Sequence, residues 1–203
     1  MHHYTDNMNM AELCIKRGFD LIASLIGILL CFLPACVIAL LIKREDGDAI
    51  IYKQERVGKG GKPFMMYKFR TMKADSEGDT PQLSQEDDSR LTRIGCWLRD
   101  HHIDELPQLY NILIGDMSIV GYRPERPYFV RQIMAINDDY AALYCMRPGI
   151  FSPATLYNGY TDTMDKMLER LRLDLQYLTT RTLWLDCKII ALTMASILSG
   201  KKF

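Results

Sequence analysis

The chain has 203 residues, of which 48% are hydrophobic, and its 25 basic side chains balance its 25 acidic ones. This length allows one ordinary domain with an added membrane segment. A formal net charge of zero provides no global field to recruit nucleic acid, so we exclude a nucleic-acid partner. The charge is nevertheless uneven, because acidic residues gather at 75–88 and basic residues at 53–73.

The six cysteines show neither Cys-x-x-Cys pairing nor a zinc-like spacing with histidine. Such usage is typical of a reducing compartment. We therefore expect the catalytic part of the chain to face the cytosol.

The first predicted element is an apolar run without a charged residue, 21–42, which is long enough for a membrane helix. Pro34, near its middle, removes a backbone hydrogen bond and disfavours an uninterrupted helix by about 3 kcal/mol. Basic pairs flank the run at 16–17 and 43–44, and the positive-inside rule assigns both ends to the cytoplasm. We predict a re-entrant helix, broken at Pro34, that enters and leaves by one face. The alternatives are a kinked spanning helix and a buried soluble helix.

Residues 50–56 and 64–70 are rich in β-branched and aromatic residues, which predicts a β-hairpin. The glycine-rich segment between them favours a turn over a phosphate-binding loop, because no helix follows it directly. Residues 74–89 are polar and acidic and contain glycine and proline, which indicates a surface loop.

Apolar residues recur at helical spacing in 91–98, and a second helix is expected from Pro107. Further helices are predicted at 128–143 and 165–178. Residues 182–198 combine many apolar residues with lysine, which indicates a helix lying in the membrane interface. A packed core helix is the alternative for this last segment.

Asp104 and Glu105 lie just before Pro107, a residue suited to the first turn of a helix. Basic residues flank them on both sides: Arg93, Arg99, Arg123, Arg126 and Arg147. Carboxylates among arginines, on a chain with one apolar segment, suggest phosphate chemistry beside a membrane. The alternative is a capped helix with surface charges.

Several short motifs follow in a fixed order: KRGFDL at 16–21, YKQERVG at 52–58, YKFRTM at 67–72, DELPQL at 104–109, GDMSIVG at 115–121, Arg123-Pro124 and Arg147-Pro148-Gly149. Each motif is modest alone, but their shared order is specific. Over nearly its whole length the chain resembles the bacterial sugar transferases, the small monotopic polyprenyl-phosphate phosphoglycosyl transferases.

The resemblance implies transfer of a sugar-1-phosphate from a UDP-sugar to polyprenyl (undecaprenyl) phosphate, with release of UMP. This reaction begins the synthesis of capsule, O-antigen, exopolysaccharide or glycoprotein glycans. The implied partners are these two substrates and lipid of the cytoplasmic leaflet of the bacterial inner membrane, with a homodimer left open. The length supports the minimal type, without the additional membrane helices of larger relatives.

The implied fold is a helix-rich α/β (α+β) domain associated with the membrane. Residues 1–45 would form the re-entrant helix, and residues 46–203 a cytosolic catalytic domain with a small β-hairpin and interfacial C-terminal helices.

Members of this family use Mg²⁺ and a covalent phosphosugar on the first carboxylate of the pair. By resemblance, Asp104 is the nucleophile, while Glu105 orients it, supports the metal or assists the lipid phosphate. A carboxylate that attacks phosphorus forms an acyl phosphate and divides one transfer into two steps. A hard cation with oxygen ligands suits Asp104 and Glu105.

Motif matching also selects four residues that would bind substrate phosphate: Lys68, Arg70, Arg123 and Arg147. An arginine holds phosphate bidentately, whereas a lysine offers a point charge. The alternatives are a solvated strand lysine for Lys68 and a structural corner for Arg147.

Arg99 and Asp186 resemble a family pair that ties the helix before the carboxylates to the C-terminal helix. The chain also departs from the family at two positions. Tyr122 stands where a proline is common, so we expect a less rigid corner. Tyr160 replaces an arginine, which puts the nucleotide-sugar contacts in doubt.

Two other functions compete with this interpretation. The first is a membrane scaffold of a glycan-assembly complex that has lost catalysis. The second is a membrane-anchored phosphohydrolase that releases sugar phosphate to water.

Overall fold

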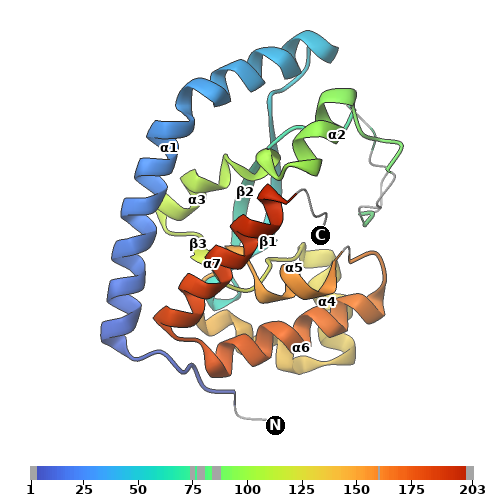
Figure 1. Cartoon of the computed structure of the whole chain (residues 1–203). Coiled ribbons are helices and arrows are strands. Elements are labelled where there is room, and N and C mark those ends of the chain that lie inside the picture. Colours follow the sequence, from blue (N-terminus) through green and yellow to red (C-terminus); the bar gives the residue numbers. More distant parts are fainter. Residues whose placement is uncertain (1–3, 74–75, 77–80, 84–87, 160, 200–203) are drawn as a thin grey trace.

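The computed structural model describes residues 4–73, 76, 81–83, 88–159 and 161–199. Its α-helices are α1 (Met10–Asp46), α2 (Arg93–Asp100), α3 (Gln108–Ile114), α4 (Pro127–Ile136), α5 (Pro153–Asn158), α6 (Met164–Thr180) and α7 (Leu183–Leu198). The strands and 3-10 helices are β1 (Ile51–Val57), η1 (Lys59–Gly61), β2 (Pro63–Phe69), η2 (Ile103–Glu105), β3 (Ser118–Val120), η3 (Asp138–Cys145) and β4 (Gly149–Phe151). Figure 1 shows the resulting helix-rich α+β fold, which confirms the predicted class.

Helix α1 runs along one whole side of the molecule (Figure 1). Asn9 and Glu12 form a capping box at its start, and Gly47, with a φ of 74°, ends it in the left-handed conformation. Pro34 lies inside the helix, which continues through it, so the predicted interruption at this residue is wrong. The axis instead changes direction along its length (Figure 1), as expected where a proline removes one backbone hydrogen bond.

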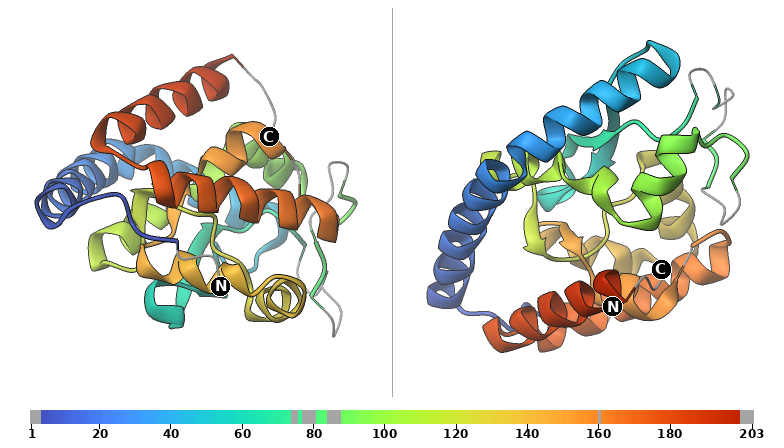
Figure 2. Two further views of the ribbon diagram at one scale, coloured as in Figure 1. Left: turned by 90° about the horizontal axis from the view of Figure 1, so that it is seen from below. Right: turned by 45° about the horizontal axis from the view of Figure 1, so that its top comes forward.

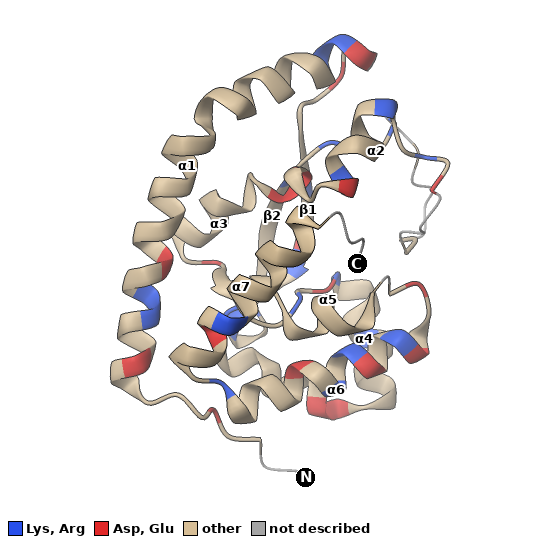
Figure 3. Cartoon of the chain, viewed as in Figure 1, with Lys and Arg blue, Asp and Glu red and all other residues tan. Residues whose placement is uncertain are grey.

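The charged residues of α1 lie at its two ends, and the long middle part is apolar (Figure 3). Among the described residues, α1 is the one helix long and apolar enough to cross a membrane, judged by length and composition. Only 11% of its most apolar window is buried inside the protein. The rest of the chain therefore leaves this surface uncovered, which argues against a buried core helix. The re-entrant path stays a prediction.

Both ends of α1 are attached to the remainder of the chain. Near its start, Lys16 Nζ lies 2.6 Å from Asp186 Oδ2 of α7, and the Tyr177 hydroxyl donates to Asp186 Oδ1 at 2.5 Å. Near its end, Glu45 Oε1 accepts hydrogen bonds from the backbone nitrogens of Arg93 (2.8 Å) and its neighbour at the start of α2. The proposed division into 1–45 and 46–203 stays a prediction.

These contacts correct the predicted pair of Arg99 and Asp186. The Asp186 carboxylate is engaged by Lys16 and Tyr177, whereas Arg99 Nε donates to Thr71 Oγ1 at 3.1 Å. The physical reason is position: α2 packs beside the end of β2, while α7 starts next to the first turns of α1. From the bend at 181–182, α6 and α7 diverge as a V (Figure 2).

Strands β1 and β2 form the predicted antiparallel hairpin. In its register Tyr52 lies opposite Lys68, and Arg56 lies opposite Phe64. Alternate residues of a strand point to the same face. Tyr52, Gln54 and Arg56 therefore share one face of β1.

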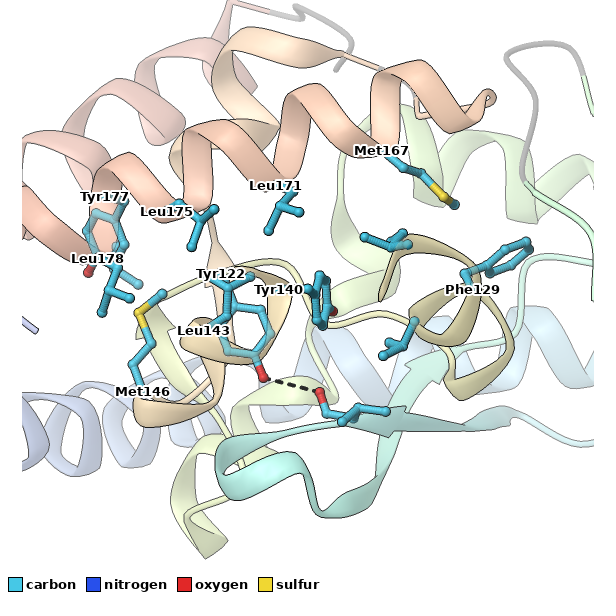
Figure 4. Packing of buried hydrophobic residues seen from close by; sticks show 14 of the residues in the cluster. Tyr122, Phe129, Tyr140, Leu143, Met146, Met167, Leu171, Leu175, Tyr177 and Leu178 are labelled. Atoms are coloured by element: carbon cyan, nitrogen blue, oxygen red, sulfur yellow. Dashed lines mark hydrogen bonds between the residues drawn. The ribbon is translucent and has the colours of Figure 1, made fainter. Parts of the chain in front are cut away.

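A second, parallel pair of strands, β3 and β4, brings the two proline-containing corners together. A Cβ on Gly121 would lie 2.4 Å from the Arg147 carbonyl oxygen, and one on Gly149 would lie 2.1 Å from the Gly121 nitrogen, so only glycine fits at either position. Tyr122 is fully buried between them and the core, and its hydroxyl donates to the Val57 carbonyl at 3.3 Å (Figure 4). This burial anchors the corner, and the expectation that it is less rigid than one with a proline stays a prediction.

The largest hydrophobic cluster lies between α4, η3 and α6 (Figure 4). The predicted helix at 128–143 is divided, because Asn137 has a φ of −144° and its side chain accepts a hydrogen bond from the Asp139 nitrogen at the start of η3. The predictions for α6 and α7 are confirmed as helices. On α7, Ile189 is buried while Trp184 is 78% exposed, so one side packs and the other is open.

Asp174 of α6 is a buried carboxylate beneath the corner that carries Arg123. Its oxygens accept hydrogen bonds from Ser152 Oγ at 2.8 Å and from the Arg123 backbone nitrogen at 3.3 Å. Burial raises the pKa of Asp174 to about 7, although Ser152 and the neighbouring Arg170 charge oppose that shift. Between about pH 4 and pH 7 the folded protein therefore holds a proton on Asp174 that the unfolded chain would release.

We predict that Lys16→Ala lowers the free energy of unfolding by about 3 kcal/mol, because it leaves the Asp186 carboxylate buried without its cation. Thermal unfolding of the detergent-solubilised chain measures the loss. The matched control is Arg44→Ala, which removes an exposed cation from the other end of the same helix. Equal effects of the two substitutions would contradict the importance of the Lys16–Asp186 pair.

The raised pKa of Asp174 predicts a pH-dependent contribution to stability. A folded-state pKa above the unfolded value of 3.8 contributes stability that is complete below about pH 4 and is lost as the pH rises through about 7. The free energy of unfolding of Asp174→Asn, subtracted from that of the parent chain between pH 4 and 8, should reveal this slope. Asp165→Asn, at an exposed position of the same helix, should leave the pH dependence unchanged. A flat difference for Asp174→Asn would show that burial does not shift its pKa.

Candidate active site

The two adjacent carboxylates lie on η2, directly after a reversal of the chain. His102 has a φ of 55° and is the one non-glycine residue with a positive φ among the described residues. This left-handed position turns the chain from α2 back toward β2. Ile103 and Leu106 then pack against a buried cluster from α1, β2 and α2: Ile38, Ile42, Phe69 and Leu98. The turn that presents the carboxylates is thus fixed to the C-terminal half of α1.

Two cations from different parts of the fold hold Glu105. Lys68 Nζ of β2 donates to Glu105 Oε1 at 2.7 Å. Arg123 donates from Nη2 to Oε1 at 2.5 Å and from Nη1 to Oε2 at 3.2 Å. A two-pronged guanidinium–carboxylate contact of this kind is strong and geometrically specific. Glu105 therefore joins the hairpin to the Arg123 corner.

Asp104 is held much more loosely. It is 5% exposed, and its nearest described cation is Lys68, whose Nζ lies 3.8 Å from Oδ2. At that distance the contact is an ion pair without a hydrogen bond. The Asp104 carboxylate is thus buried but free of the firm pairing that engages both oxygens of its neighbour.

The two carboxyl groups consequently have pKa shifts in opposite directions. Burial raises the pKa of Asp104, and the adjacent Glu105 charge adds to that rise, although Lys68 opposes it. Burial acts on Glu105 in the same sense, but Arg123 and Lys68 outweigh it and hold the pKa of Glu105 well below its usual range. Neighbouring carboxylates with divergent pKa values are typical of sites that assign them different roles.

Both carboxylates line a cavity of about 510 Å³, a volume within the usual range for small-molecule sites. One wall is the face of the hairpin that carries Tyr52, Gln54 and Lys68. Nine basic and three acidic side chains line it: Arg56, Lys68, Arg70, Lys73, Arg90, Arg99, Arg123, Arg126 and Arg170, with Asp104, Glu105 and Glu125. This excess of positive charge fits an anionic ligand.

The structure brings most of the predicted site residues to this cavity. Lys68, Arg70 and Arg123 line it, as does Arg99, which was predicted only as a structural residue. Arg70 also pairs with Asp48, its Nη1 lying 2.8 Å from the carboxylate. The predicted position Tyr160 lies outside the described residues.

Arg147 is the exception among the predicted phosphate-binding residues. Its Nε donates to the Gly115 carbonyl at 2.8 Å, at the C-terminal end of α3, and it does not line the cavity. Arg17 donates to the Ile112 and Leu113 carbonyls of the same helix end. Cations stabilise the C-terminal carbonyls of a helix. In the structure Arg147 therefore stabilises a helix end, and its predicted contact with phosphate stays a prediction.

The side chains available as metal ligands determine how the cavity could hold the predicted magnesium ion. Within the described residues, no group of three or more His, Cys, Asp or Glu side chains is placed to hold a metal. Mg²⁺ commonly binds through one or two carboxylates together with substrate phosphates and water. Asp104 suits that arrangement, whereas both oxygens of Glu105 are already engaged by Lys68 and Arg123.

Among the charged residues of the cavity, the sequence did not identify Arg56, Lys73, Arg90, Glu125 and Arg170, and Arg126 was expected only as a basic neighbour of the carboxylates. One signal was available for Arg56: alternation along β1 and the hairpin register place it on the same face as Tyr52 and Lys68. Glu125 and Arg126 follow the Arg123 corner directly. Arg170 comes from α6, and no spacing in the sequence connects it to the hairpin.

Comparisons with known proteins agree with this site. A model of the family described as "Bacterial sugar transferase" matches residues 11–200. The chain is 40% identical, over 92% of its length, to the UDP-N-acetylgalactosamine-undecaprenyl-phosphate N-acetylgalactosaminephosphotransferase of Aeromonas hydrophila. It is also similar to the UDP-glucose:undecaprenyl-phosphate glucose-1-phosphate transferases of Escherichia coli (36% identity over 89% of the chain) and Caulobacter vibrioides (40% over 91%).

The relatives differ in how much of their own length is matched. The chain spans 44% of the Aeromonas relative and 39% of the Escherichia relative, which is less than half of each, but 70% of the Caulobacter relative. The family match covers nearly all of the chain, from α1 to α7. The chain belongs to the bacterial sugar transferase family.

Proposed function

We propose that this chain transfers a sugar-1-phosphate from a UDP-sugar to polyprenyl phosphate and releases UMP, which would initiate a surface glycan. The observation that carries the proposal is the loosely held Asp104 carboxylate in a cavity dominated by basic side chains. Relatives named for transfer of glucose-1-phosphate or N-acetylgalactosamine phosphate to undecaprenyl phosphate support the same reaction class.

The electrostatics of the cavity suit two phosphorylated substrates. A diphosphate brings negative charge to the site, and it would be repelled by two ionised carboxylates alone. Lys68 and Arg123 offset the charge of Glu105, and the further arginines leave the cavity cationic. Cations that neutralise developing charge are the main protein contribution to phosphoryl transfer.

The chemistry would proceed in two displacements. An Asp104 carboxylate oxygen attacks the phosphorus that bears the sugar, the bond to the bridging oxygen breaks, and UMP departs with that oxygen and its electron pair. An oxygen of polyprenyl phosphate then attacks the same phosphorus and releases Asp104 as a carboxylate. Glu105, fixed by two cations, would keep Lys68 and Arg123 positioned at the phosphate.

The chain's own residues also fit the magnesium ion that the family implies. Asp104 would hold it together with the substrate's phosphate oxygens, and Glu105 would act through its pairs with Lys68 and Arg123 rather than as a ligand. When bound, Mg²⁺ neutralises charge on the diphosphate.

We also propose that α1 lies in the membrane, with both ends at the cytoplasmic face. Its uncovered apolar surface and the basic residues at its two ends support this placement. Exposed apolar residues also occur on α2, α3 and α7, and these elements would rest on the lipid surface: Trp97 (50% exposed), Tyr110 (51%), Ile114 (50%) and Trp184 (78%).

Incubation with a UDP-sugar and Mg²⁺, without lipid acceptor, should give a burst of UMP limited to about one equivalent per enzyme, because Asp104 retains the phosphosugar. Intact-protein mass spectrometry, across a panel of UDP-sugars, would detect the added mass. Asp104→Asn should abolish both the burst and the added mass. Glu105→Gln, the matched control, should still acquire the mass, although more slowly.

Other outcomes of this experiment would identify the competing functions. Continuous UMP release without polyprenyl phosphate would indicate a phosphohydrolase. No UMP from any UDP-sugar, with or without acceptor, would indicate a catalytically inactive scaffold.

The membrane path of α1 predicts that Lys16 and Lys43 lie on the same side of the bilayer. A variant that keeps Cys14, which is exposed two residues from Lys16, as its single cysteine and a Lys43→Cys variant of the cysteine-free chain should both be protected from a membrane-impermeant maleimide in spheroplasts and should both react after lysis. Reaction of one position before lysis would instead establish a spanning helix.

A further inference from the structure

The cavity contains a second group of charges, at the end of the hairpin face away from Lys68. Arg56 and Lys68 are separated by four positions in the β1–β2 register, which is about 13 Å along the strand. Arg56 lies beside Arg126, at the start of α4, and Arg170 of α6. Three elements distant in the sequence therefore place guanidinium groups at one end of the cavity.

A single carboxylate, that of Glu125, forms ion pairs with two of these arginines. Its Oε2 lies 3.1 Å from Arg56 Nη1, and its Oε1 pairs with Arg170 Nη2. Glu125 is 5% exposed, so both ion pairs lie inside the protein. One negative charge cannot neutralise both guanidinium groups, and the Arg126 side chain lies at the same wall.

Burial and neighbouring positive charges both act on the pKa values of these arginines. Burial lowers the pKa of Arg56 to about 9, and the nearby Arg123 and Arg126 charges add to that lowering. Burial likewise lowers the pKa of Arg170 to about 9; the Asp174 charge opposes this lowering, and the Arg123 and Arg56 charges add to it. Arg56 Nε is in addition a buried donor without an acceptor in the described part of the chain. A bound anion would relieve both the repulsion and the unpaired donor.

We propose that Arg56, Arg126 and Arg170 form a second anion subsite, which binds the phosphate of the departing nucleotide. This inference rests on the proposed transfer from a UDP-sugar and assigns the orientation of that donor in the cavity. The sugar-bearing phosphate lies between Lys68, Arg123 and Asp104, and the nucleotide phosphate lies toward Arg56.

Arg123 connects the two subsites. Its guanidinium contacts Glu105 at the first subsite, and its charge acts on Arg56 and Arg170 at the second. The two phosphates of a diphosphate are directly bonded through one oxygen, so they can lie on either side of one guanidinium. The nucleoside would then extend over the wall formed by Phe129 and Ala154.

The position also suits the chemistry of the first step. When an Asp104 oxygen bonds to the sugar-bearing phosphorus, the bridging oxygen departs with its electron pair, and negative charge accumulates on the nucleotide phosphate. Guanidinium groups already fixed around that phosphate stabilise the charge as it develops. Polyprenyl phosphate, in contrast, must reach the first subsite to attack the same phosphorus.

Binding of UMP to the full chain, measured by calorimetry without lipid acceptor, tests the assignment. Arg126→Gln should raise the dissociation constant for UMP about tenfold, because it removes one charge-assisted contact to phosphate. Arg170→Lys should also weaken UMP binding, since it keeps a charge to pair Glu125 but loses the planar fork. The matched control Arg131→Gln, at an exposed position of α4 outside the cavity, should leave UMP binding unchanged.

Unchanged UMP binding in both Arg126→Gln and Arg170→Lys would overturn the proposal. So would a rise in the KM for polyprenyl phosphate with no change for UMP, since the subsite would then belong to the acceptor. If Arg170→Lys fails to fold, as thermal unfolding would reveal, Arg126→Gln decides alone, because Arg126 is half-buried at a helix start. Failure of the proposed function is separate: the parent chain would then release no UMP from any UDP-sugar, or would release it continuously without polyprenyl phosphate.

Discussion

The pairing of Glu105 with Lys68 and Arg123 is the interaction on which the site depends. A carboxylate in a buried position costs several kcal/mol unless cations and hydrogen bonds compensate it. Here the compensation comes from a strand and from a corner more than fifty residues later, so the ion pairs exist only when the hairpin, η2 and the corner are all in place. The same pairing leaves Asp104 without a firm partner and thus available for chemistry.

The surrounding packing fixes the positions of these two cations. Lys68 is held by the register of the hairpin, and Arg123 by the close backbone contact of Gly121 with Gly149 and by the burial of Tyr122. Beneath this corner, Asp174 accepts a hydrogen bond from the Arg123 backbone. The packed backbone of the corner thereby gives the Arg123 guanidinium a defined position. A surface arginine would not have such a position.

The sequence was most informative where local pattern decides structure. Alternating β-branched and aromatic residues predicted the hairpin, helical spacing predicted α6 and α7, and the motif order identified Asp104, Lys68 and Arg123. The sequence was least informative about contacts between elements that are distant in the chain.

Two contacts illustrate this limit. The pairing of Asp186 with Lys16 rather than Arg99, and the placement of Arg147 at the end of α3 rather than in the cavity, depend on how α1 lies against the other helices. Arg170 had no local signal for the same reason. The single helix expected at 128–143 failed for a local reason, because Asn137 caps the following turn with its side chain.

The contact between Lys16 and Asp186 joins residues 170 positions apart, across almost the whole chain. Because α1 precedes α7 in the chain, Lys16 has no carboxylate to neutralise it in this pocket until α7 has been synthesised. The Lys16–Asp186 pair can therefore form only after the segments between α1 and α7 have been synthesised.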